Sequence, residues 1–86
     1  MNKDKLLKEF VEFLKKQNYS PTTAYVYKNR VRSILNKVDR YNASLEEVTE
    51  ILRKKGIREK VIVQYTWAWE KWHEFIEEMK LNDVYY

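Results

Sequence analysis

Hydrophobic residues recur along this chain at spacings of three and four, which is the period of an amphipathic helix. Four such stretches follow one another, and the last is both the longest and the richest in aromatic residues. They span residues 4–17, 21–38, 45–55 and 58–80. The pattern predicts an all-α fold, a compact four-helix bundle with short connections that forms a single domain over residues 1–86.

Each predicted helix carries one stripe that we expect to be buried, and the segment 39–43 between the second and third helices is expected to be a polar connection. The expected buried positions are Leu6, Phe10, Phe13, Leu14 and Gln17, then Thr23, Ala24, Tyr27, Val31, Ile34, Leu35 and Val38, then Leu45, Val48, Ile51 and Leu52, and finally Val61, Tyr65, Ala68, Trp69, Trp72, Phe75, Ile76 and Met79.

Local signals mark several helix ends. Ser20 is a preferred N-cap residue, and the proline that follows it fits the first helical position, where a missing N–H costs nothing. Ser44 precedes Glu47 by three residues, which is the spacing of a capping box. Gly56, the only glycine in the chain, is expected to end the third helix.

Composition narrows the functional classes. The 86 residues suffice for one modest core, and there is no cysteine, which excludes disulfides and thiolate metal sites. With His73 as the only histidine, we expect no bound metal. The chain has no glycine-rich phosphate loop and no nucleophile elbow, so we expect no cofactor and no catalytic residue. No apolar run reaches the roughly 18 residues of a membrane span, which favours a cytoplasmic protein without membrane contact.

Charge is unevenly distributed along the sequence. The net charge is +4, and residues 15–38 contain six basic side chains without a single Asp or Glu. A second basic cluster surrounds Gly56, whereas the stretch from Glu74 to Asp83 is mainly acidic. Because solvated surfaces usually mix both signs, this distribution indicates a polarised molecule with an anionic partner.

The face of the second helix opposite its apolar stripe has the character of a DNA-contacting surface. It offers amide, hydroxyl and guanidinium groups, which can bond base edges and phosphate oxygens. The helix N-terminus adds free N–H groups and a partial positive charge. The candidate residues here are Thr22, Thr23, Tyr25, Lys28, Asn29, Arg32, Ser33 and Asn36. The plainer interpretation is an ordinary solvated helix face, although such a face usually includes a glutamate or two.

Two further groups of residues are candidates for contact with double-stranded DNA. Around Gly56, a cluster of basic side chains is suited to neutralising phosphates: Arg53, Lys54, Lys55 and Arg58. On the fourth helix, polar residues lie away from the main apolar stripe: Lys60, Gln64 and Lys71. A solubilising turn is the alternative for the first group, and packing or a partner-binding surface is the alternative for the second.

The order of these parts resembles the core-binding domain of tyrosine recombinases of the phage integrase family. Phe10, Phe13 and Leu14 fit the end of that family's first helix, Ser20, Thr23 and Tyr27 its Ser-x-x-Thr phrase and tyrosine, and Val31, Ile34 and Leu35 its later apolar positions. The resemblance covers roughly residues 6–80. It implies a SAM-like helical fold and a role in DNA recombination and integration by a mobile element, with the second and fourth helices contacting DNA and the protein associated with the nucleoid.

Two features depart from the family's pattern. The segment Ile57-Arg58-Glu59-Lys60 stands where the family often has a second Ser/Thr cap. The recombinase catalytic domain, with its tyrosine nucleophile, has no room in 86 residues, so we expect no catalysis by this chain alone.

A second hypothesis is a protein-interaction module. Val63 and Trp67 lie on a side of the fourth helix that is otherwise lined by polar residues, and the chain ends in Val84-Tyr85-Tyr86. In this interpretation Val63, Trp67, Tyr85 and Tyr86 bind a second copy of the chain, a recombinase or another partner. The acidic C-terminal end would then pair with the basic block of a neighbour.

Overall fold

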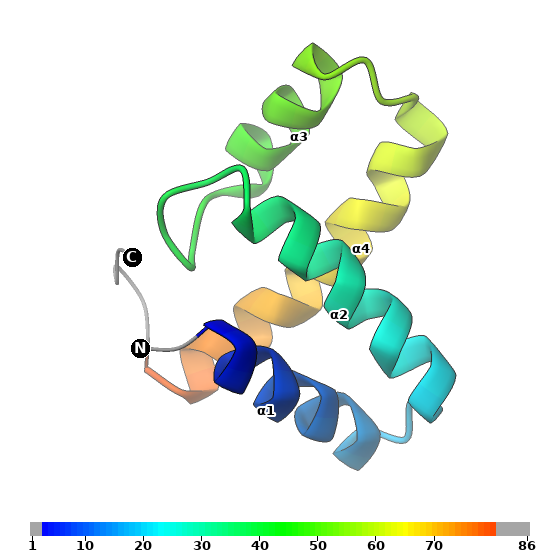
Figure 1. Ribbon diagram of the computed structural model, residues 1–86, viewed down its shortest axis with the longest axis vertical. Helices are drawn as coiled ribbons and strands as arrows, with labels where there is room; N and C mark the ends of the chain where they lie inside the picture. Colours follow the sequence, from blue (N-terminus) through cyan, green and yellow to red (C-terminus); the bar gives the residue numbers. More distant parts are fainter. Residues whose placement is uncertain (1–2, 81–86) are drawn as a thin grey trace.

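The computed structural model describes residues 3–80 and shows four α-helices in a compact bundle (Figure 1). Helix α1 spans Lys3–Lys16, α2 Pro21–Leu35, α3 Leu45–Lys54 and α4 Glu59–Glu78. The all-α architecture predicted from the periodicity is confirmed, and within the described residues no β-strand is present. The bundle measures 33 × 28 × 17 Å, and α4 packs against each of the other three helices.

The predicted helix ends are formed by the expected residues. The hydroxyl of Ser20 accepts a hydrogen bond from the Thr23 amide, and the hydroxyl of Ser44 accepts one from the Glu47 amide. Gly56 follows Lys55, the C-cap of α3, and has a φ of +81°, the left-handed conformation that ends many helices. The Gly56 and Ile57 amides donate to carbonyl oxygens in the last turn of α3.

Helix α1 ends in the same manner, but with Asn18 in place of glycine. Asn18 has a φ of 71°, and its amide and that of Tyr19 donate to the carbonyl oxygens of Lys15 and Leu14. Asparagine tolerates the left-handed region better than most residues, which explains why this helix stops without a glycine. The turn brings α2 back against α1.

The buried stripes differ in detail from the predicted ones. On α1, Gln17 is exposed and lies beyond the helix, whereas Leu7 and Val11, which the prediction omitted, are buried. The prediction chose one narrow stripe, but α1 contacts both α2 and α4 and therefore buries a wider face. On α4, Val61 and Met79 are exposed at its two ends, and Ile62 is buried instead.

The second helix is shorter than predicted. It ends at Leu35, where the Asn36 amide caps the last turn, so Val38 lies in the following connection. Val38 nevertheless packs against the core from there. Thr23 and Tyr27 on the same stripe are only half-buried.

The connection between α2 and α3 is not the polar loop that its sequence suggested. Tyr41 and Ala43 are completely buried, because α4 holds this segment against the core. The Trp72 indole donates a hydrogen bond to the Tyr41 carbonyl at 2.8 Å, and the Trp69 indole donates one to the Ala43 carbonyl at 2.7 Å. His73 Nε2 lies 2.9 Å from the same Ala43 oxygen. Two tryptophans can therefore be buried with their N–H groups satisfied.

Aromatic rings join α1 to α4 in the centre of the bundle. The rings of Phe10 and Trp72 meet edge to face at 5.2 Å between centroids, and Phe75 lies 5.7 Å from Phe10. Such offset and edge-on geometries are the favoured ones for aromatic pairs. The core thus fixes α4 as the central element against which the surface of α2 is presented.

Candidate nucleic-acid interface

The outward face of α2 is exposed and free of carboxylates, as the sequence predicted. Its polar members extend over the whole helix, and Tyr25 and Val26 lie among them at 51% and 39% exposure. The exposed residues of this face are Thr22, Tyr25, Val26, Asn29, Arg32 and Asn36. They recur at the spacing of one helical stripe, so a ligand lying along α2 would meet all of them.

The N-terminal turn of α2 is held by a small hydroxyl network. The Ser20 hydroxyl accepts from the Thr23 amide at 3.1 Å and lies 3.0 Å from the Thr23 hydroxyl. Thr23 is half-buried and engaged in this cap, whereas Thr22 is exposed. Of the two threonines, Thr22 is therefore the one whose side chain is better placed to meet a phosphate.

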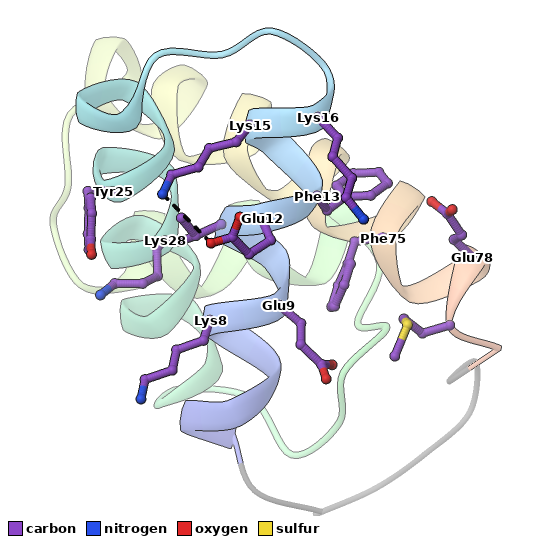
Figure 2. Close-up of a pocket in the computed structure, with 12 residues that line it drawn as sticks. Lys8, Glu9, Glu12, Phe13, Lys15, Lys16, Tyr25, Lys28, Phe75 and Glu78 are labelled. Carbon is purple, nitrogen blue, oxygen red and sulfur yellow. Dashed lines mark ion pairs between the residues drawn. The ribbon is translucent and has the colours of Figure 1, made fainter.

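Lys28 stands at the border between α2 and α1. Its ammonium group lies 4.5 Å from the centre of the Tyr25 ring, a cation–π contact that joins the two side chains. Lys8 and Lys15 of α1 line the same groove, and Figure 2 shows them on the same flank as Lys28 and Tyr25. Sequence reasoning did not select Lys8 or Lys15, because only the packing of α1 beside α2 brings them next to this face.

The groove beside α1 is not uniformly basic. Glu12 forms an ion pair with Lys15 at 3.7 Å, drawn as a dashed line in Figure 2. Glu9 and Glu78 also line the groove, together with the apolar rings of Phe13 and Phe75. The continuous acid-free surface therefore belongs to α2, and the lysines of α1 extend it at one edge only.

At the other end of α2, Ser33 is engaged within the helix. Lys37 Nζ donates to the Ser33 hydroxyl at 3.0 Å and to its carbonyl oxygen at 3.1 Å. The Ser33 hydroxyl is consequently less available to a ligand than the exposed Asn29, Arg32 and Asn36. The lysine does, however, bring a positive charge to the C-terminal end of the face.

The basic cluster at the α3–α4 turn is exposed, but one of its members is already paired. Arg53 Nε and Nη2 donate to the two carboxylate oxygens of Glu59 at 2.5 and 3.3 Å. This hydrogen bonding lowers the pKa of Glu59. Lys54, Lys55 and Arg58 are exposed and form no ion pair with another described residue.

The α4 candidates divide into two kinds. Lys60 is exposed, whereas Gln64 and Lys71 are half-buried. Gln64 accepts a hydrogen bond from Arg30 of α2 at 3.2 Å. Lys71 pairs with Glu74 at 3.1 Å, which raises the pKa of Lys71, and lies 5.7 Å from the centre of the Tyr19 ring.

The structure thus brings Gln64 and Lys71 to the edge of α4 that faces α2 and the preceding turn. Arg30, on the flank of α2, is the link between the two helices. Its position could have been expected only with knowledge of how α2 and α4 cross (Figure 1).

The residues of the alternative, partner-binding hypothesis are exposed where the structure describes them. Trp67 is 56% exposed and Val63 is 44% exposed, both on α4. Tyr85 and Tyr86 lie outside the described residues 3–80. Trp67 is also the only one of the three tryptophans that is not buried, so its exposure is not explained by the core.

The described part of the chain has neither a metal-ligand cluster nor a membrane-spanning helix. No group of three or more potential metal-ligating side chains occurs within residues 3–80. No helix in that range is both long and apolar enough to cross a membrane. Comparisons with protein-family models, curated proteins and solved structures give no match for this chain.

Proposed function

We propose that this chain is a DNA-binding module that contacts a duplex with the outward face of α2. The observation that carries the proposal is that this exposed face has amide, hydroxyl and basic groups along the whole 15-residue helix and no carboxylate. Ordinary solvated faces mix charge signs, as the outer residues of α1 and α4 do here. A surface without acid is suited to a polyanion.

The chemistry of the face fits both kinds of contact that DNA offers. Asn29 and Asn36 carry amides that can form paired bonds to adenine, and Arg32 can do the same with guanine. Thr22, at the helix N-terminus, is suited to a phosphate oxygen. Lys28, held over the Tyr25 ring, adds positive charge at the border of the face.

Other basic groups can contact DNA phosphates, and such contacts do not depend on the base sequence of the DNA. The exposed side chains of Lys54, Lys55 and Arg58 can neutralise phosphates beside the α3–α4 turn, which would make binding sensitive to salt. On α4, Lys60, Gln64 and Lys71 are proposed as secondary contacts. Gln64 already bonds to Arg30 and Lys71 to Glu74, so each would have to contact the DNA in addition to its present partner.

The resemblance to the core-binding domain of tyrosine recombinases suggests the setting in which such a module acts. In this proposal the chain is a non-catalytic part of DNA recombination or integration, nucleoid-associated, either within a recombinase or as a separate binder. The support is the order of sequence features around α2 together with the four-helix fold. A DNA-bound recombinase would then be a second partner of the chain.

Fluorescence anisotropy of a labelled random duplex, titrated with the protein at low and moderate salt, tests the proposal. We expect binding that weakens steeply as salt is raised, since several phosphates are neutralised at once. Site selection on a DNA library would then define the preferred sequence. Absence of binding even at low salt would rule out the proposed role of α2.

A pair of matched variants assigns the binding to α2. Lys28→Glu combined with Arg32→Ala changes the net charge by the same amount as Lys5→Glu combined with Lys16→Ala on α1. We expect the first double variant to lose binding while keeping the fold, because both its residues belong to the α2 surface. The α1 variant should lose affinity only modestly. Equal losses in both would indicate a general charge effect and contradict the assignment to α2.

A further inference from the structure

The outer side of α4 carries a stripe of exposed residues that its own core contacts leave free. Lys60, Val63, Trp67, Glu70 and Glu74 follow one another at spacings of three, four, three and four. Positions with this spacing line one face of a helix, as in a coiled coil, and here Val63 and Trp67 form the apolar centre between charged ends. Trp67, at the centre of the stripe, is 56% exposed, and the nearby Val63 is 44% exposed.

We infer that this stripe is a self-association surface, on which α4 of a second copy of the chain packs antiparallel with the two-fold axis at Trp67. A symmetric interface must be complementary to itself. With the axis at residue 67, a residue that precedes Trp67 in one helix lies opposite the residue that follows Trp67 by the same number of positions in the other helix. Trp67 itself therefore meets Trp67 of the second copy. Val63 then lies at the level of Lys71 of the partner helix, at the border of the stripe.

The charges along the stripe fit this antiparallel register. Lys60 lies seven residues before Trp67 and Glu74 lies seven residues after it, about 10.5 Å along the helix in each direction. The axis therefore brings Lys60 of each copy opposite Glu74 of the other, which forms two equivalent ion pairs. A parallel register would instead place Lys60 opposite Lys60 and Glu74 opposite Glu74, with repulsion at both ends.

The contacts that Lys60 and Glu74 make within one chain leave both side chains able to pair with a second copy. Lys60 forms no ion pair within residues 3–80. Glu74 is paired with Lys71 through one oxygen at 3.1 Å, and its side chain remains 49% exposed. The carboxylate can thus accept a second lysine without releasing the first.

The stripe shares only Lys60, a secondary DNA contact, with the proposed DNA-binding residues, and includes none of the residues of the α2 face. Helix α2 contacts α4 and crosses in front of it in Figure 1, and the α4 residue that bonds to α2, Gln64, lies outside the stripe. Self-association would leave both α2 faces open, and it does not depend on the proposed DNA binding. The short seam buries less than a standard interface of about 1,600 Å². We therefore expect reversible association at high protein concentration.

Trp67 provides a direct readout, because Trp69 and Trp72 are completely buried. Acrylamide quenching of tryptophan fluorescence should fall as protein concentration rises, in parallel with dimer formation in sedimentation equilibrium. Trp67→Glu, checked for its fold by circular dichroism, should raise the dissociation constant more than about tenfold. A protein that stays monomeric at about 1 mM overturns the inference. So does protection of Trp67 by duplex DNA without protection by concentration.

A charge exchange tests the register itself. Lys60→Glu alone and Glu74→Lys alone should each weaken the dimer about fivefold or more, because each places like charges opposite one another. The double variant Lys60→Glu with Glu74→Lys should restore association to near the original level. Lys54→Glu with Glu46→Lys on α3, outside the stripe, is the matched control and should leave association unchanged. Failure of the double variant to restore a dimer that both single changes weaken would overturn the antiparallel register.

Discussion

The indole N–H of Trp72 on α4 donates a hydrogen bond to the carbonyl oxygen of Tyr41, 31 residues earlier in the chain. Tyr41 lies in the connection between α2 and α3, so this bond fixes a loop to the longest helix. Removing the donor takes a hydrogen bond away from a buried carbonyl, which costs about 1–3 kcal/mol. Trp72→Phe should lower the free energy of unfolding by at least that amount, as measured by urea denaturation followed by circular dichroism.

The control for this effect is Trp67→Phe. It removes an indole N–H from an exposed ring that lies outside the buried core, so stability should change by less than about 0.5 kcal/mol. Equal losses from the two substitutions would show that the Trp72 hydrogen bond contributes little.

The two serine caps should contribute similarly to stability. Ser44→Ala and Ser20→Ala each remove the acceptor for an amide in the first helical turn. Each change should cost about 1 kcal/mol. The corresponding threonine variants keep the acceptor and should recover most of the loss, which thermal unfolding would measure. An alanine variant as stable as the parent would contradict the capping role.

Substitutions at the two left-handed residues, Asn18 after α1 and Gly56 after α3, should change stability in opposite directions. At Gly56 an added Cβ meets no atom within 4 Å, so Gly56→Ala should destabilise only through its φ of +81°, by about 1 kcal/mol. At Asn18, with a φ of 71°, substitution by glycine should be neutral or slightly stabilising. Urea denaturation of both variants would check the signs. A larger loss at Gly56 would point to a steric contact.

The Arg53–Glu59 pair predicts a particular acid response. The hydrogen bond from Arg53 lowers the pKa of Glu59 from its ordinary value of 4.5. A carboxyl whose pKa is depressed on folding stabilises the folded state above its ordinary pKa, and this contribution disappears as pH falls through the lowered value. NMR titration should place the Glu59 pKa below 4.5, and Arg53→Met should return it toward 4.5. An unchanged pKa in that variant would exclude the pair as the cause.

The same pair bears on the proposed DNA contact. Glu59 accepts from Nε and Nη2 of Arg53, which partly neutralises the guanidinium and leaves fewer of its N–H groups for a phosphate. Glu59→Gln should therefore strengthen duplex binding and make its salt dependence steeper, because one more cation becomes available. Anisotropy titrations over a range of salt would measure both. Glu46→Gln, an equal change in charge elsewhere on α3, is the control and should have a smaller effect.

Sequence reasoning succeeded where the signal is local. The Ser20 and Ser44 caps and the stop at Gly56 depend on residues within one turn, and each was found from the chain itself. The exposed face of α2 was likewise found, since it follows from helical periodicity within one element. These signals survive because tertiary contacts reinforce rather than override them.

Long-range relationships could not be found in this way. Tyr41 is buried because the indoles of two tryptophans of α4 bond to carbonyl oxygens of its segment. No local sequence pattern marks it as a buried residue. The approach of Arg30 to Gln64, and of Lys8 and Lys15 to Lys28, depends on how helices cross. Periodicity describes one helix at a time and contains no information on crossing angles.

The connection between α2 and α3 is held in place by α4, and this has a consequence for synthesis of the protein. The ribosome makes α1, α2 and the Tyr41 segment first, but the indoles that hold that segment arrive only with residues 69 and 72. The apolar sides of the first three helices therefore emerge before the helix that covers them. We expect the bundle to form only once α4 has left the exit tunnel, in one cooperative step, with chaperones meeting an unfinished core until then.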